Sequence, residues 1–309
     1  MTKRLAILAL VCATAASAQT VRGGPPVFTR ADTLRGANGP GRSWWDVEYY
    51  DLRVAVNPAD SSISGSNGIT YRVTGASNGS LQIDLQVPMV LDSVIQGGKK
   101  LEFTRDSNAF FVKTQARQNN GSRQTVTAYY HGKPKAARRP PWDGGFIWQR
   151  DSTGNRFIAT ANEGLGASVW WPNKDYSADE PDSQGVVITV PTGMTNVSNG
   201  RLRSIQVDQR AGTSTFDYFV SSPINNYNIS VNAGTYAHFT ETFKGEKGDL
   251  TMDFFPLKIH EDTARVQFKQ ALSMMSCFEK WFGPFPWYKD GFKLVEAPHL
   301  GMEHQSAVA

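Results

Sequence analysis

The stretch DVEYYDLRVAV, from Asp46 to Val56, alternates apolar and polar residues and contains one irregular step. Alternation at every second residue is typical of a strand that buries one face. Five residues are candidates for the buried face: Val47, Tyr49, Leu52, Val54 and Val56. The stretch therefore predicts a long, half-buried strand at the start of a folded domain.

Short alternating runs recur after this strand, and turn-forming segments such as GASNG and QGGKK separate them. Short strands at this spacing favour a large antiparallel β-sandwich or saddle. No helical period of useful length occurs before residue 260. The predicted strands are Ile69–Val73, Leu81–Leu85, Ala109–Lys113, Thr125–Tyr130, Val186–Val190, Thr215–Val220 and Tyr227–Val231.

The pattern changes to a helical period between Glu261 and Pro284, and a buried strand is predicted from Phe292 to Pro298. We therefore expect a β-domain over residues 44–244 and the start of an α/β domain over residues 245–309. One helix and a few strands cannot enclose a core, so this second domain is expected to be incomplete. The predicted apolar face of the helix comprises Ala264, Phe268, Leu272, Met275, Phe278 and Phe282.

The chain begins with a signal-peptide pattern over residues 1–18: Lys3 and Arg4, a short apolar run, and an Ala-Ser-Ala cleavage site. The apolar run is too short to cross a bilayer, so we predict an exported protein, periplasmic or secreted, with no transmembrane segment. Residues 19–43 are rich in Gly, Pro and Arg and predict a flexible lead-in. Cleavage leaves one cysteine, Cys277, which we expect to fill the core rather than to form a disulfide.

Composition excludes few partners. The formal charge is +4, and charged residues make up 19% of the chain. The densest basic cluster, Lys133–Pro141, holds four positive charges, which are too few to indicate nucleic-acid binding. We interpret this cluster as a solvated loop.

Two near-matches to zinc-binding motifs occur among the histidines. His260-Glu261 begins the pattern HExxH, but Ala264 stands where the second histidine is required. HLGMEH fails the inverted pattern HxxEH by one residue. We predict no complete metal site in this chain, and the absence of GxSxG gives no catalytic nucleophile. The five histidines are His131, His238, His260, His299 and His304.

Two carboxylates have conspicuous surroundings. Glu163 precedes a Gly-rich turn and the aromatic pair Trp170-Trp171, and Glu303 follows the predicted buried strand. Two carboxylates that meet in one pocket would favour a cationic ligand group.

Four segments, in the same order, resemble the aminopeptidase N-like zinc metallopeptidases, a gluzincin family that includes leukotriene A hydrolase. DVEYYDLRVAV is similar to the family's opening strand, and GLGASVWWPNKDYSADEPDS to the segment around its WxPxxDxP motif. FEKWFGPFPWYK is similar to the helix end before its catalytic core, and LGMEH to its GxMEN motif. The resemblance covers most of the chain from residue 44 onward.

The resemblance implies a β-saddle domain followed by a thermolysin-like catalytic domain. It assigns Glu303, together with Glu163, to the free α-amine of a peptide substrate. It also places the backbone of Gly301 and Met302 along the peptide as an edge strand. His304 replaces the usual asparagine, which implies either a preserved hydrogen bond or pH sensitivity near neutrality.

The family's zinc helix and catalytic tyrosine are expected beyond this segment. The chain is therefore identified as an N-terminal fragment of a zinc aminopeptidase. The fragment itself is expected to bind no catalytic zinc and to turn over no substrate.

Two other functions remain open at this point. A non-catalytic exported β-sandwich could bind a peptide or glycan, with Trp170-Trp171 as a stacking platform. A glycosidase could use Glu163 and Glu303 as acid and nucleophile.

Overall fold

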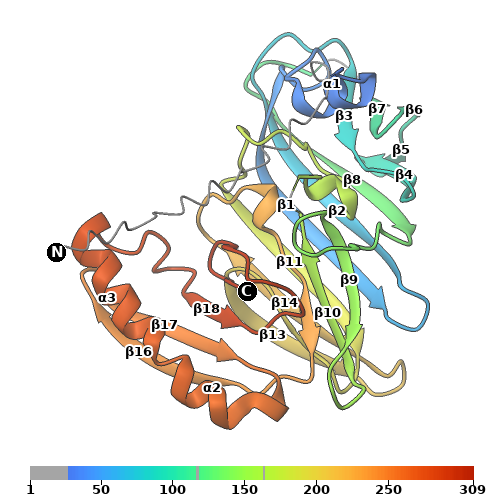
Figure 1. The fold of residues 1–309 in the computed structure, drawn as a ribbon. Helices are drawn as coiled ribbons and strands as arrows, with labels where there is room; N and C mark the ends of the chain where they lie inside the picture. Colours follow the sequence, from blue (N-terminus) through green and yellow to red (C-terminus); the bar gives the residue numbers. More distant parts are fainter. Residues whose placement is uncertain (1–26, 116–117, 163) are drawn as a thin grey trace, which may run out of the picture.

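The computed structural model describes residues 27–115, 118–162 and 164–309 (Figure 1). The predicted signal peptide, the first part of the predicted lead-in and Glu163 lie outside these residues. None of the helices in the described ranges combines the length and the apolar character that crossing a membrane requires.

An eight-stranded sheet forms the main layer of the β-domain, as the alternating runs predict. Its described strand pairs are antiparallel except for β1 and β11, which run parallel and pair Leu52 with Val186. The expectation of a purely antiparallel sheet is therefore wrong at this one pair. In spatial order the strands are β13 (Arg201–Asp208), β14 (Thr213–Val220), β11 (Ser183–Pro191), β1 (Trp45–Asn57), β2 (Ser62–Val73), β8 (Arg123–Gly132), β4 (Val90–Gln96) and β5 (Lys99–Lys100).

Two smaller sheets complete the β-domain, and side chains from all three sheets share one hydrophobic core. Trp170 and Trp171 lie in this core, next to the short 3-10 helix η1 (Ala167–Val169), and are fully buried. The idea that they form an exposed stacking platform is therefore wrong. The smaller sheets comprise β12 (Thr195–Val197), β15 (Asn232–Gly234), β10 (Arg156–Ala161) and β9 (Gly145–Arg150), and β3 (Ser80–Asp84), β7 (Ala109–Lys113) and β6 (Phe103–Asp106).

The irregular step in the opening stretch is a β-bulge. The register of β1 against β2 shifts between Val47 and Tyr49. Because a one-residue shift exchanges the two faces of a strand, Tyr50 takes the core position and Tyr49 stays half-buried. The prediction of Tyr49 as a core residue is therefore wrong by one position.

The last predicted strand of the β-domain, Tyr227–Val231, is also wrong. The chain there forms a 3-10 turn, η2 (Asn226–Asn228), and pairs only afterwards as β15. The side chain of Asn225 caps the turn by accepting a hydrogen bond from Tyr227 N at 3.1 Å. A side chain that bonds its own backbone two residues on favours a turn over a strand.

The C-terminal part forms a second unit with its own core (Figure 1). The predicted strand β18 (Phe292–Val295) is confirmed and pairs parallel with β17 (Gly248–Phe255). β16 (Phe239–Gly245) completes this three-stranded sheet. The helical crossover between β17 and β18 contains η3 (Lys258–His260), α2 (Glu261–Gln267) and α3 (Gln270–Phe282).

The single predicted helix is thus two helices, and its far end is not buried. Ala264 and Met275 lie in the core as expected. Phe278 and Phe282 are 51% and 83% exposed, and Cys277 is a free, exposed thiol. The prediction of these three residues as core residues is wrong, because the sheet contacts only the first part of the apolar face.

The described part of the predicted lead-in, residues 27–43, is structured rather than flexible. Helix α1 (Arg30–Gly36) begins at a capping box formed by Thr29 and Asp32. The guanidinium of Arg42 is fully buried and donates to Arg35 O at 2.6 Å and Ala37 O at 2.7 Å. These bonds satisfy carbonyl groups at the end of α1.

Arg42 also forms a buried ion pair with Asp84 of β3. The Asp84 carboxylate accepts a further hydrogen bond from Asp175 N at 3.0 Å, on the segment that follows Trp171. The ion pair therefore ties the lead-in to the centre of the β-domain.

We expect Arg42→Met to reduce the free energy of unfolding by about 3–5 kcal/mol, because it leaves the buried Asp84 carboxylate without its partner. Urea denaturation followed by circular dichroism measures this loss. Arg30→Met is the control, because Arg30 pairs with Asp106 on the surface and is 70% exposed; its loss should be much smaller than that of Arg42→Met. Equal losses in the two variants would contradict the assignment.

Candidate functional site

Glu303 lies on the segment that follows β18, and its side chain is exposed. The hydroxyl of Tyr227, from η2, donates to Glu303 Oε1 at 2.8 Å. The backbone N–H of Glu303 and the Tyr227 hydroxyl lower the pKa of the Glu303 carboxyl. The Glu303 carboxyl therefore favours its ionised form, and its hydrogen-bond donor, the Tyr227 hydroxyl, is neutral.

His304 turns the opposite way and is fully buried. Its ring meets the edge of the Tyr227 ring at 6.0 Å, and neither ring nitrogen has a hydrogen-bond partner among the described residues. Burial lowers the pKa of His304 to about 4. The lowered pKa favours the neutral imidazole at neutral pH, and the described residues form no hydrogen bond to its ring nitrogens.

Gly301 and Met302 pack against the segment near Ala309. Met302 N donates to Ala309 O, and Ala309 N donates to Met302 O, both at 2.9 Å. A Cβ at Gly301 would lie 2.3 Å from Ala309 O, so only glycine fits there. The main-chain groups of Met302 are thus already paired.

The segment 303–306, which we call the docked segment, is held on the β-domain by the turn Asn199-Gly200. Gly200 N donates to Ser306 Oγ at 2.9 Å, and Asn199 Nδ2 donates to Gln305 O at 2.7 Å. Gly200 has φ of +74°, and a Cβ there would lie 2.1 Å from Phe219 O. The turn therefore requires glycine.

Two further contacts hold Gln305. Its N–H donates to Asn228 Oδ1 at 3.0 Å, and its Nε2 donates to Pro223 O at 3.0 Å. Asn228 belongs to η2, the same turn that carries Tyr227. The position of the Glu303 carboxylate thus depends on β-domain residues on both sides of the docked segment.

Lys293 of β18 fastens the same turn from the C-terminal unit. Its side chain is 4% exposed, and its Nζ donates to Gly200 O. Burial lowers the pKa of Lys293 to about 7, and the nearby Asp253 opposes that effect. Gly200 therefore donates one hydrogen bond to Ser306 and accepts one from Lys293, two separate parts of the C-terminal unit.

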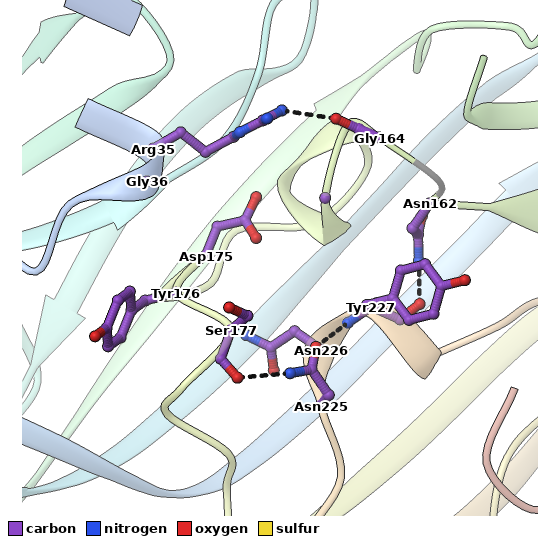
Figure 2. Close-up of a pocket in the computed structure, with 11 residues that line it drawn as sticks. Arg35, Gly36, Asn162, Gly164, Asp175, Tyr176, Ser177, Asn225, Asn226 and Tyr227 are labelled. Atoms are coloured by element: carbon purple, nitrogen blue, oxygen red, sulfur yellow. Dashed lines mark hydrogen bonds between the residues drawn. The ribbon is translucent and has the colours of Figure 1, made fainter. Parts of the chain in front are cut away.

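Glu163 lies outside the described residues. Asn162 Nδ2 donates to Tyr227 O at 2.8 Å. Gly164 and Tyr227 line one cavity of about 380 Å³, which Figure 2 shows between α1 and the 3-10 turn. Arg35 reaches over this cavity and donates to Gly164 O at 3.2 Å.

The remaining histidines do not approach one another as a ligand set. His131, His238 and His260 each contact a single carboxylate, of Asp92, Asp253 and Glu296 respectively, at 2.7–2.9 Å. Within the described ranges, no group of three or more His, Cys, Asp or Glu side chains is arranged to hold a metal ion.

Sequence reasoning missed Tyr227, Asn199 and Lys293. Tyr227 was assigned to a strand, and nothing in the local sequence of Asn199 or Lys293 distinguishes them from other turn and strand residues. Their contacts join positions 76 to 106 residues apart, which no short motif contains.

The sequence matches no protein-family model and no curated protein. The fold is similar to solved structures of zinc peptidases. The M1 zinc metallopeptidase from Deinococcus radiodurans aligns with a TM-score of 0.73 at 18% identity, over 87% of this chain and 61% of that chain. A mutant of that enzyme was solved with a Tyr-Ser-Ala substrate, with a TM-score of 0.72. Native yeast LTA4 hydrolase aligns with a TM-score of 0.65 at 16% identity, over 86% of this chain and 40% of that chain.

This chain therefore spans about 61% and 40% of the lengths of these two proteins. The likeness confirms the predicted fold class, a mainly β saddle or sandwich domain followed by the first part of a thermolysin-like α/β domain.

Lys293 should make the free energy of unfolding depend on pH in the neutral to alkaline range. Its pKa is lower in the folded chain than in the unfolded one, so between about pH 7 and 10 the unfolded chain binds more protons. The free energy of unfolding should therefore rise with pH, by up to about 1.4 kcal/mol per unit. Lys293→Met should remove this rise in urea titrations, and the exposed-site control Lys113→Met should keep it. A rise that persists in Lys293→Met would refute this account.

His304 should make the fold sensitive to acid. Its folded pKa of about 4 lies below the ordinary value of 6.5, so the unfolded chain binds more protons between these values. Stability is therefore present above about pH 6.5 and decreases as the pH falls toward 4. His304→Asn should reduce this loss, measured by melting temperature against pH, whereas His131→Asn should not. Identical acid limbs in the unaltered chain and His304→Asn would count against a buried neutral imidazole.

Proposed function

We propose that this chain is the N-terminal part of an exported zinc aminopeptidase of the aminopeptidase N-like family. Its β-domain would occupy residues 44–244 and its catalytic domain would begin near residue 245. The observation that carries the proposal is the exposed Glu303 carboxylate, which accepts a hydrogen bond from the Tyr227 hydroxyl and has a lowered pKa. The fold shared with zinc peptidases supports it.

Glu303 would bind the free α-ammonium of a peptide, because opposite charges at hydrogen-bond distance stabilise each other. An anchor at the amino end fixes which peptide bond reaches the reaction centre, so only the first residue is removed. Glu163 would share this role. Its place just before the segment with Trp170-Trp171, which resembles the family's motif, supports this assignment.

The substrate backbone would add as a strand beside residues 301–303. The main-chain groups of Met302 already pair with Ala309, and the backbone N–H of Glu303 interacts with its own carboxyl. His304 would act below this surface as packing for Tyr227 rather than as a ligand.

Zinc would be held by a helix beyond this segment and would supply an activated water for hydrolysis. In this chain we assign substrate-binding residues only, with no catalytic residue and no metal ligand. The isolated chain would therefore bind peptides and leave them intact.

Export is the expected localisation, periplasmic or secreted. The Lys-Arg start, short apolar run and Ala-Ser-Ala site of residues 1–18 support it. A signal-peptidase cleavage assay on the natural precursor would test this part separately.

In the full-length protein, Glu303→Gln should raise KM for an aminoacyl anilide about 10- to 100-fold, because a charged hydrogen bond to the ammonium is lost. Turnover of the N-acetylated substrate should change little. Glu102→Gln, on an exposed loop, is the control and should alter neither. If Glu303→Gln slows both substrates equally, the amine anchor is wrong.

A further inference from the structure

We propose that Tyr227 is a positioning residue for the amine anchor: its hydroxyl holds the Glu303 carboxylate in the orientation that receives a substrate ammonium. This inference rests on the proposed function, since it assumes that Glu303 binds that group.

Tyr227 is itself fixed at three points. Its N–H donates to Asn225 Oδ1 at 3.1 Å, its carbonyl accepts from Asn162 Nδ2 at 2.8 Å, and its hydroxyl donates to Glu303 Oε1 at 2.8 Å. The backbone of the residue is thus anchored before the side chain reaches the carboxylate. An anchored donor can select one rotamer of an exposed glutamate that would otherwise sample several.

The ring of Tyr227 is confined as well. His304 meets it edge-on, with the ring planes at 69°, and His304 is fully buried and fixed. Figure 2 shows the backbone side of Tyr227 at the cavity, where Asn162 and Asn225 contact it. The buried His304 ring therefore limits the phenol on that side.

The choice of a tyrosine has a chemical consequence. A lysine or arginine at this point would neutralise the carboxylate and compete with the substrate ammonium. A neutral hydroxyl orients the carboxylate, favours its ionised form and leaves its charge for the ligand. In the described residues, the groups that face Glu303 are Tyr227 and His304, and His299 faces His304.

Tyr227 also connects two parts of the site that are distant in sequence. It bonds Asn162, on the turn after β10, and Glu303, on the segment after β18. A shift of Asn162 or of Glu303 would move Tyr227, so Tyr227 couples the positions of these two residues.

Tyr227→Phe tests this role, because it keeps the ring and removes only the hydroxyl. In this chain, the pKa of the Glu303 carboxyl should rise, measured by carboxyl NMR titration with Glu303→Gln to assign the signal. In the full-length enzyme, KM for the aminoacyl anilide should rise about 3- to 10-fold while kcat changes little. The acid limb of kcat/KM should move to higher pH.

Tyr236→Phe is the matched control. The Tyr236 hydroxyl donates at 2.8 Å to the backbone carbonyl of Glu296, seven residues before Glu303 in the sequence. This variant should leave both the Glu303 titration and KM unchanged. A general loosening of the fold would instead affect both variants and lower the melting temperature of both.

The outcomes separate the two proposals. An unchanged Glu303 titration and KM in Tyr227→Phe would overturn the role of Tyr227. A shifted titration in this chain, with no preference of the full-length protein for free over acetylated amines, would overturn the aminopeptidase function instead.

Discussion

The structure depends on the hydrogen bonds that Gly200 makes to the C-terminal unit. Its N–H binds Ser306 and its carbonyl binds Lys293, so one residue of the β-domain holds both β18 and the docked segment. Only glycine can adopt this backbone conformation so close to Phe219. Together with the bonds of Gln305 to Asn228 and Pro223, these contacts set the position of Glu303 relative to Tyr227.

The ionisable groups of the site differ in exposure and therefore in the charge state that they favour. Glu303 stays exposed and ionised, with a neutral donor, and is therefore suited to a ligand charge. His304 and Lys293 are buried, and burial lowers the pKa of each, so both favour the neutral form more than they would in water. Residues that hold the site thus avoid adding positive charges that would compete with a ligand ammonium for the Glu303 carboxylate.

Local patterns in the sequence predict some of the strands, because burial of one face repeats at every second residue. β1, β2, β3, β7, β8, β11 and β14 follow from this alternation, and β18 follows from its apolar residues. The same reasoning fails at Tyr227–Val231, where the Asn225 side chain favours a turn, and at α1, which is stabilised by Arg42 from outside the helix. It also fails at Phe278 and Phe282, because alternation and helical period say nothing of how far a neighbouring sheet extends.

The anchor Glu303 could be found from a short motif, but its partners could not. Tyr227 and Asn199 act through bonds across 76 and 106 residues, and only the fold brings them together. The resemblance therefore identifies the carboxylate, and the structure adds the residues that orient it. A short motif can therefore suggest a function, whereas the contacts that orient Glu303 can be found only in the folded structure.

A crystal structure of this chain with a bound aminoacyl amide tests the central claim most directly. The account predicts the ligand ammonium within about 3 Å of a Glu303 carboxylate oxygen, with the Tyr227 hydroxyl still on Oε1 and Ser306 still on Gly200. A ligand amine bound elsewhere, or a docked segment detached from Gly200, would contradict it.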